Sequence, residues 1–411
     1  MSNTGCRFCG ATLEHSVVDL GMSPLANSYL QLAQLRQMEP FYPLCVYVCG
    51  KCFLVQLEEF ATPYEIFSDY AYFSSYSDTW LQHAKAYTNM VVERFGLSAK
   101  DQVLEIASND GYLLQYFAQR GIPVLGIEPA ANVARAAQAN GIETLVKFFG
   151  TKTACELKTA GWRPSLVVGN NVLAHVPQLN DFVEGMKIVL APRGVITMEF
   201  PHLLRLMVEN QFDTIYHEHF SYFSFLTVEK IFATHGLKVF DVEELPVHGG
   251  SLRIYACHTD DTTKLTSAQM TNLRAREEAA GFSRLSHYLS FGETIKETKR
   301  KLLEFLITAK RDKKTVIGYG APAKGNTLLN YCGIRSDFVE YTVDRSPHKQ
   351  GHFLPGTHIP IYAPEKIRET MPDYVLILPW NIKEEIMTQM AYIREWGGRF
   401  VVPIPEVKVC A

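Results

Sequence analysis

The sequence predicts an α/β protein in which a small cysteine-rich N-terminal lobe precedes two Rossmann-like domains. Four cysteines stand in two pairs near the N-terminus, and two later segments alternate short apolar strands with helix-length stretches. Each later segment contains a strand, a glycine-containing turn and a helix, which is the repeating unit of a doubly wound sheet. We therefore expect domains at residues 1–63, 64–290 and 291–411.

Composition excludes several classes of protein. Of the 411 residues, 47% are hydrophobic and 20% are charged, which is typical of a globular chain. The net charge of −3 lacks the positive excess that non-specific nucleic-acid binding needs. No signal-peptide pattern opens the chain and no run approaches the ~18 apolar residues of a membrane span. We expect a cytoplasmic protein without nucleic-acid or membrane partners, either a monomer or a weak homodimer.

The N-terminal lobe carries the strongest local motif. Its four cysteines form two Cys-x-x-Cys pairs, Cys6 with Cys9 and Cys49 with Cys52. This spacing can place four thiolates tetrahedrally around Zn²⁺, with no position left open for a substrate. We predict a structural zinc ion, because the strand-like runs at 16–20 and 42–48 are too short to support a core of their own. Two unrelated cysteine pairs are the alternative.

The middle of the chain predicts one parallel sheet. Residues 64–80 are rich in aromatic side chains, show no helical or strand period, and are expected to form a covering loop. An amphipathic helix follows to about residue 95. The predicted strands, separated by helix-length segments, are 102–106, 123–127, 165–168 and 194–200.

The first turn of this sheet is a candidate nucleoside site. Residues 105–111, Glu-Ile-Ala-Ser-Asn-Asp-Gly, follow a strand and open a helix. Glu128 ends the next strand, about 20 residues further on, where a carboxylate can accept both ribose hydroxyls. The glycine spacing for a pyrophosphate is absent, whereas Glu105 and Asp110 suit the positive charges of S-adenosylmethionine. Methyl transfer is therefore favoured over hydride transfer, with an ordinary strand-turn-helix as the alternative.

The C-terminal segment predicts a smaller α/β domain. Residues 266–311 are charged and helical, and 315–326 form a second strand-glycine-helix unit. Backbone N–H groups of this turn, together with Lys324, can hold a diphosphate. A turn with only a packing role remains an alternative, and an NAD-dependent oxidoreductase is the enzymatic rival. Further strands are expected at 339–343, 374–378 and 399–402.

Six motifs occurring in order resemble the sugar C-methyltransferases. They are the two cysteine pairs and the segments 105–111, 170–175, 216–221, 248–253 and 318–326. The resemblance covers essentially the whole chain, although Ala107 stands where glycine is expected. It implies S-adenosylmethionine as cofactor, structural zinc, and C-3 methylation of a nucleotide-linked 4-keto-6-deoxysugar, with dTDP as the expected nucleotide. C-5 methylation is the alternative position.

Catalysis is predicted in the segment Tyr216-His-Glu-His219. A 4-keto group acidifies the neighbouring C–H, so a base and stabilisation of the enolate oxygen create a carbon nucleophile. By resemblance His219 is the base, with Tyr216 and Glu218 beside it. If the segment is extended, His217 points away from them. A metal site or a polar surface strand is the alternative.

The remaining site residues follow from the resemblance and from position. His175 follows a strand at the ligand-binding edge of the sheet, although a lone histidine there is often structural, and Tyr70 is expected to reach the sugar. Further cofactor contacts are expected from Ala107, Asn109, Gly111 and Asn171. Substrate contacts are expected from Tyr76, His248, Arg253, Tyr319, Gly320, Lys324 and Asn326. A non-enzymatic zinc-ribbon interaction module would leave both α/β domains unexplained.

Overall fold

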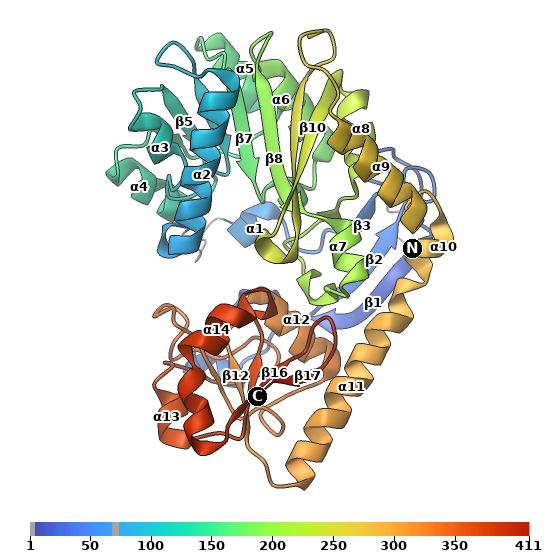
Figure 1. Cartoon of the computed structure of the whole chain (residues 1–411), viewed down its shortest axis with the longest axis vertical. Helices are drawn as coiled ribbons and strands as arrows, with labels where there is room; N and C mark the ends of the chain where they lie inside the picture. The colour runs from blue at the N-terminus through green and yellow to red at the C-terminus, as the bar shows by residue number, and fades with distance from the viewer. Residues whose placement is uncertain (1–4, 68–73, 411) are drawn as a thin grey trace.

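The computed structural model describes residues 5–67 and 74–410, and it contains sheets of four, seven and six strands (Figure 1). The predicted α/β class is confirmed. The seven-stranded sheet occupies one end of the molecule and the six-stranded sheet the other, and the long helix α11 runs from beside the N-terminal lobe along one side of the half that holds the six-stranded sheet (Figure 1). Within the described residues, no helix is both long enough and apolar enough to cross a membrane.

The N-terminal lobe is an antiparallel sheet with a strand borrowed from the middle of the chain. Its order is β1 (His15–Ser23), β2 (Tyr42–Val48), β3 (Val55–Leu57) and β9 (Ser221–Tyr222). β3 pairs with β9 through only two residue pairs. The lobe thereby shares its core with later elements, as its small size requires.

The segment expected to be a loop is partly helical. It contains α1 (Pro63–Phe67) and the 3₁₀ turn η2 (Ser74–Tyr76), and helix α2 (Asp78–Phe95) begins earlier than predicted. The reason is the cap: the Ser77 side chain accepts a hydrogen bond from Trp80 N at 3.3 Å, satisfying one of the donors that a helix N-terminus leaves open.

The seven-stranded sheet has the order β10-β11-β8-β7-β4-β5-β6. The four predicted strands are present and parallel, and an antiparallel hairpin that the sequence did not predict extends the sheet beyond β8. The strands are β4 (Val103–Ile106), β5 (Val124–Ile127), β6 (Thr144–Leu145), β7 (Leu166–Asn170), β8 (Val195–Pro201), β10 (Leu237–Leu245) and β11 (Ser251–His258). The helices are α3 (Leu114–Ala118), α4 (Ala131–Ala139), α5 (Thr151–Thr159), α6 (Leu179–Val189), α7 (Leu203–Val208), α8 (Phe225–Thr234), α9 (Ala268–Ala280) and α10 (Leu285–Leu289).

The C-terminal sheet is parallel except for its last strand. Its order is β14-β13-β12-β15-β16-β17. The strands are β12 (Val316–Tyr319), β13 (Thr342–Val343), β14 (Ile361–Tyr362), β15 (Tyr374–Ile377), β16 (Arg399–Val402) and β17 (Lys408–Cys410). The helices are α11 (Phe291–Arg311), α12 (Ala323–Cys332), α13 (Lys366–Thr370) and α14 (Lys383–Gln389). Helix α11 buries an apolar face that includes Ile295, Leu302 and Leu306.

Candidate active site and zinc site

A cavity of about 1160 Å³ lies where segments of the three sheets meet. One wall comes from the carboxyl ends of parallel strands in the seven-stranded sheet, which is where ligands bind in such sheets. These strand-end residues are Ile106, Ile127, Asn170 and Pro201. The start of α12 supplies Lys324, and the N-terminal lobe supplies Asn27 and Tyr29.

Three of the four residues of the Tyr-His-Glu-His turn (residues 216–219) line this cavity. The segment is not extended, because His219 N donates to Tyr216 O at 2.9 Å and closes a turn. The turn sends Tyr216, Glu218 and His219 toward the cavity. His217 faces elsewhere, as expected, with Nε2 3.1 Å from Pro43 O.

His219 is arranged as a neutral base. Its Nδ1 lies 2.9 Å from the carbonyl oxygen of Thr214, and only a protonated Nδ1 can donate to that acceptor, so Nε2 carries the lone pair. Burial, and then the neighbouring His175, hold the pKa of His219 well below its ordinary value. The imidazole is therefore uncharged and able to accept a proton at neutral pH.

His175 supports the turn from the seven-stranded sheet. Its Nδ1 lies 2.8 Å from Glu218 O, and its ring meets that of His219 edge-on at 4.7 Å between centroids. Burial lowers the pKa of His175 to about 4, so this ring is also neutral. The two histidines can thus pack together without charge repulsion.

Tyr216 and Glu218 are hydroxyl and carboxyl groups with raised pKa values. The centroid of the Tyr216 ring lies 4.2 Å from that of the His219 ring. Burial, reinforced by Glu218, raises the Tyr216 pKa well above 10, so the phenol keeps its proton. Glu218 Oε1 accepts a hydrogen bond from Asn27 Nδ2 at 2.6 Å. Burial nevertheless raises the Glu218 pKa to about 7.

The turn after β4 forms the floor at the other end of the cavity. Four of the residues predicted to contact the cofactor line it, namely Ala107, Asn109, Glu128 and Asn171. Both Glu128 oxygens accept backbone N–H groups, from Asn109 at 2.9 Å and Ala130 at 2.8 Å. Each oxygen retains a second lone pair, so the carboxylate can still accept ribose hydroxyls.

Glu105 and Asp110 lie beneath this floor rather than in the cavity wall. Among the described residues, neither Glu105 oxygen accepts a hydrogen bond of ordinary geometry, and Asp110 Oδ1 is buried without a partner. Burial, then Asp110 and Glu128, raise the Glu105 pKa well above 4.5, and the nearby Tyr112 offsets only part of this. Within the described part of the chain no cation acts on Glu105 or Glu128, and such a concentration of buried acid fits a positively charged ligand such as S-adenosylmethionine.

Gly111 has a conformational role in the same turn. Its φ is +79°, and a Cβ there would lie 2.9 Å from the Ile142 side chain, so only glycine fits without strain. The residue does not line the cavity. Ala107, with φ of +59°, occupies the same left-handed region, which explains why glycine is the expected residue at that position.

The structure does not bring Arg253 into the cavity. The register of β11 places it opposite Glu199 on β8 and Glu243 on β10. Its guanidinium binds both carboxylates, at 2.8 and 2.9 Å respectively. The predicted substrate contact is therefore replaced by a buried ion pair that joins the hairpin to the sheet.

Backbone N–H groups of the glycine turn after β12 already donate hydrogen bonds within the protein. Gly320 N donates to Val343 O at 2.6 Å and Ala321 N donates to Asp344 Oδ2 at 2.7 Å, so the expected N–H cradle is occupied. Tyr319 is buried in the core, and the Asn326 side chain is buried with Nδ2 donating to Ala26 O. These three predicted substrate residues do not line the cavity, whereas Lys324 does.

Lys324 is held in a buried polar cluster. Its Nζ donates to Asn381 Oδ1 at 2.7 Å and lies over the Trp380 ring at 4.5 Å. Burial lowers the Lys324 pKa to about 8, while buried Asp213 opposes the shift. The ammonium group is available to pair with an anion in the cavity.

Two predicted tyrosines do not enter the described cavity wall. Tyr70 lies outside the described residues. Tyr76 is exposed and stacks on the ring of His348 at 6.2 Å. His248 does line the cavity and meets the Trp80 ring edge-on at 5.1 Å.

Several cavity residues were missed by sequence reasoning. Besides Asn27 and Tyr29, they include His348, Lys349 and His352, which follow β13 and add basic side chains to the C-terminal end of the cavity. The sequence does carry a local signal for them, since three basic side chains stand within five positions shortly after the predicted strand at 339–343. Nothing local connects Asn27 with Glu218, which is 191 residues away.

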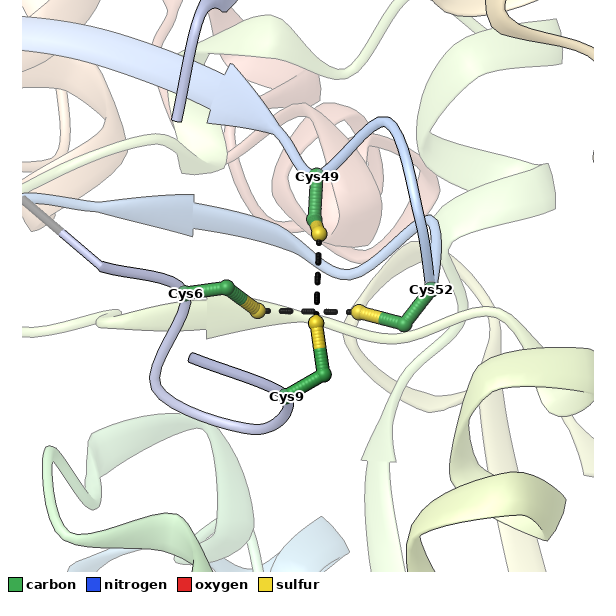
Figure 2. A group of neighbouring side chains, drawn as sticks. All are labelled: Cys6, Cys9, Cys49 and Cys52. Carbon is green, nitrogen blue, oxygen red and sulfur yellow. Dashed lines mark hydrogen bonds between the residues drawn. The ribbon is translucent and has the colours of Figure 1, made fainter. Parts of the chain in front are cut away.

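The four predicted cysteines converge on one point (Figure 2). All four sulfurs lie within 4.8 Å of one another, and the pairs Cys6–Cys52 and Cys9–Cys49 are each 3.5 Å apart. Sulfurs about 2.3 Å from a tetrahedral zinc ion are separated by about 3.8 Å, so the cluster fits that ion. Four thiolates complete the coordination, and the site is structural.

Comparison with known proteins identifies the class. Residues 80–242 match a methyltransferase domain, residues 246–405 match a C-methyltransferase C-terminal domain, and residues 6–67 match a zinc binding domain. Together with the buried acid at the floor of the sheet, these matches define an S-adenosylmethionine-dependent methyltransferase with a zinc-binding lobe.

The chain belongs to the C-methyltransferase family. It is 37% identical over 404 residues to the C-methyltransferase NovU of Streptomyces niveus, covering 98% of this chain and 96% of that protein. Among solved structures, magnesium protoporphyrin IX methyltransferase of Synechocystis with bound cofactor is 14% identical, covers 43% of this chain and 79% of that chain, and has a TM-score of 0.34. The CcbJ methyltransferase of Streptomyces caelestis is 12% identical with coverages of 43% and 89% and a TM-score of 0.34.

We predict that Cys6→Ser lowers zinc below one ion per chain and lowers the unfolding temperature, because a closed four-thiolate site loses one ligand. Elemental analysis and thermal unfolding measure both effects. Cys155→Ser is the matched control, since Cys155 is exposed and outside the cluster. Full zinc content and unchanged stability in Cys6→Ser would rule out the assignment.

We predict that Glu105→Gln stabilises the cofactor-free protein at pH 8 by about 1–3 kcal/mol, the scale of a buried unsatisfied polar group. The folded-state pKa of Glu105 is raised, so ionisation destabilises the fold increasingly as pH rises above about 4.5. The gain should shrink at pH 5, while S-adenosylmethionine binding weakens. Denaturant titrations with exposed Glu143→Gln as control test this, and a loss of stability at both pH values would contradict it.

Proposed function

We propose that the protein methylates C-3 of a nucleotide-linked 4-keto-6-deoxysugar, with dTDP as the nucleotide, using S-adenosylmethionine. The observation that carries the proposal is the pairing of a neutral, Nδ1-tethered His219 with a protonated Tyr216 on one cavity wall. A base beside a hydroxyl donor is what removal of a proton next to a ketone requires. The resemblance to the sugar C-methyltransferases supplies the sugar and the carbon.

In the proposed reaction His219 Nε2 removes the proton from C-3. The electron pair of that C–H bond forms the enolate, and Tyr216 donates a hydrogen bond to the oxygen at C-4 where negative charge develops. When bound, S-adenosylmethionine supplies an electrophilic methyl group. The enolate carbon takes this methyl group, S-adenosylhomocysteine leaves, and the proton on His219 passes to solvent. His175 keeps the turn in place through Glu218 O.

The C-terminal end of the cavity suits the diphosphate of such a substrate. Lys324 and Lys349 are cations, and His348 and His352 add N–H donors on the same side. Burial lowers the Lys349 pKa, but Tyr29 and Asp344 outweigh this and leave it raised, so the group stays charged. We propose that these four residues replace the expected backbone cradle as the diphosphate site.

The assignment is tested with a panel of nucleotide-linked 4-ketosugars and S-adenosylmethionine. Mass spectrometry should show a gain of one methyl group, and NMR of the product should place it on C-3. Methylation at C-5 would correct the position. Turnover of none of these sugars would contradict the proposed substrate class.

We predict that His219→Gln binds both substrates but loses at least ~10²-fold in methyl transfer, the usual contribution of a positioned base. In D₂O with S-adenosylhomocysteine in place of the methyl donor, wild type should introduce deuterium at the carbon next to the ketone, and the variant should not. His217→Gln is the matched control, because His217 does not line the cavity. Full turnover by His219→Gln would show that His219 is not the base, and His175 would then be the candidate.

We predict that kcat falls as pH rises through about 7, because Glu218 ionises there and places negative charge beside the forming enolate. The carboxyl pKa is raised, so the group is neutral below this pH and anionic above it. Glu218→Gln should remove the inflection. Buried Asp213 also has a pKa raised to about 7, so Asp213→Asn is the control, and loss of the inflection there instead would contradict the assignment.

A further inference from the structure

Arg7 lies inside the first cysteine pair of the zinc cluster but reaches out of the lobe. Its Nη1 donates to the carbonyl oxygen of Phe220 at 2.7 Å, and its Nη2 donates to that of Leu57 at 2.6 Å. Phe220 directly follows His219 in the sequence. The guanidinium also lies 5.5 Å from the centre of the Phe220 ring. One side chain therefore connects the metal-binding segment to the Tyr-His-Glu-His turn.

The contact falls where the β3–β9 pairing ends. That ladder contains only Val55 with Tyr222 and Gln56 with Ser221. Beyond it, Leu57 N donates to Phe220 O at 3.0 Å, so this carbonyl accepts two hydrogen bonds. Arg7 thereby continues the two-residue ladder with charge-assisted hydrogen bonds to both strands. Such bonds are stronger than those between neutral groups.

The other end of Arg7 is fixed by the zinc cluster. Its backbone N donates to Gln56 Oε1 at 3.0 Å, and Gln56 Nε2 donates to Cys6 Sγ at 3.2 Å. Asn180 Nδ2 donates to Phe8 O at 2.9 Å on the far side of the same loop. A metal bound to Cys6 and Cys9 holds the residues on both sides of Arg7, so the position of its side chain follows from the closed site.

We propose that Arg7 is a positioning residue that uses the zinc site to fix His219 against its substrate. This proposal rests on the proposed function of His219 as the base. Proton transfer requires the base and the C–H bond to lie within hydrogen-bond reach, and a displacement of 1 Å can cost about 10²-fold in rate. A carbonyl held on the residue after His219 restrains that geometry without touching substrate.

The test compares Arg7→Gln, Arg7→Lys and Lys51→Gln in the full-length zinc protein. Lys51 is the matched control, since it lies inside the second cysteine pair and is exposed. Zinc content is measured by elemental analysis, and hydrogen–deuterium exchange is followed in peptides covering Leu57 and residues 214–222. Steady-state kcat and KM are measured with S-adenosylmethionine and a nucleotide-linked 4-ketosugar.

Arg7→Gln should retain one zinc per chain, exchange faster in those peptides alone, and lose about 10-fold or more in kcat with KM changed less than about 2-fold. Arg7→Lys should recover part of kcat by restoring one charged donor, and Lys51→Gln should behave as wild type. Wild-type exchange and kcat in Arg7→Gln would overturn the proposal. So would loss of zinc with faster exchange across the whole lobe, because the residue would then be merely structural.

The two proposals fail differently. If wild type turns over none of the 4-ketosugars, the proposed substrate is wrong, and the exchange measurement still decides whether Arg7 restrains the turn. If wild type is active and Arg7→Gln is equally active, the substrate assignment stands and the positioning role fails.

Discussion

The site depends on one backbone segment, residues 214–222, being held from three directions. Arg7 of the zinc lobe binds Phe220 O, His175 of the seven-stranded sheet binds Glu218 O, and the Thr327 hydroxyl on α12 donates to Ile215 O at 3.0 Å. Arg7 gives Phe220 O a second hydrogen bond beside that from Leu57 N, whereas His175 and Thr327 supply donors to Glu218 O and Ile215 O, and buried carbonyls are costly to leave unpaired. The position of His219 is therefore a joint property of all three parts of the chain.

Burial explains why His175 and His219 stay neutral. Burial removes water from around the rings and holds the pKa of His175 at about 4, and that of His219 well below its ordinary value. A charged imidazolium would be unstable in this environment, so a proton taken from substrate has only a short residence there. A base of this kind suits a reaction in which the carbon nucleophile is consumed by an electrophile already in place.

Most of the fold was predicted from the strand pattern and the cysteine spacing, because both are local features of the sequence. Parallel strands such as β4 and β5 are short apolar runs, and Cys6 and Cys9 are separated by two residues. The β10–β11 hairpin was not predicted, because its place in the sheet depends on pairing between strands that are distant in the sequence. Only that pairing shows Arg253 between two carboxylates.

The site was predictable where a motif and its chemistry coincide. His219 and Lys324 stand in recognisable segments, and both line the cavity. The glycine turn at Gly320 was wrongly predicted to hold a diphosphate with its N–H groups. A sequence indicates a turn, but it does not show which acceptors within the protein those N–H groups already have. The contact between Asn27 and Glu218 joins residues from opposite halves of the chain, and no local pattern encodes it.

Opposite charges stand at the two ends of the cavity, and on the proposed function they determine how the two reactants are oriented. Acid from Glu105, Asp110 and Glu128 gathers under the end nearest β4, and Lys324 and Lys349 stand at the end nearest α12. On the proposed function, a sulfonium cofactor and an anionic nucleotide-sugar would be drawn to opposite ends, and each would be repelled from the place of the other. His219 lines the same cavity and carries no charge, so it adds to neither end. On the proposed function, the same polarity that separates the ligands leaves the neutral His219 free to act on the substrate without pairing with either charge.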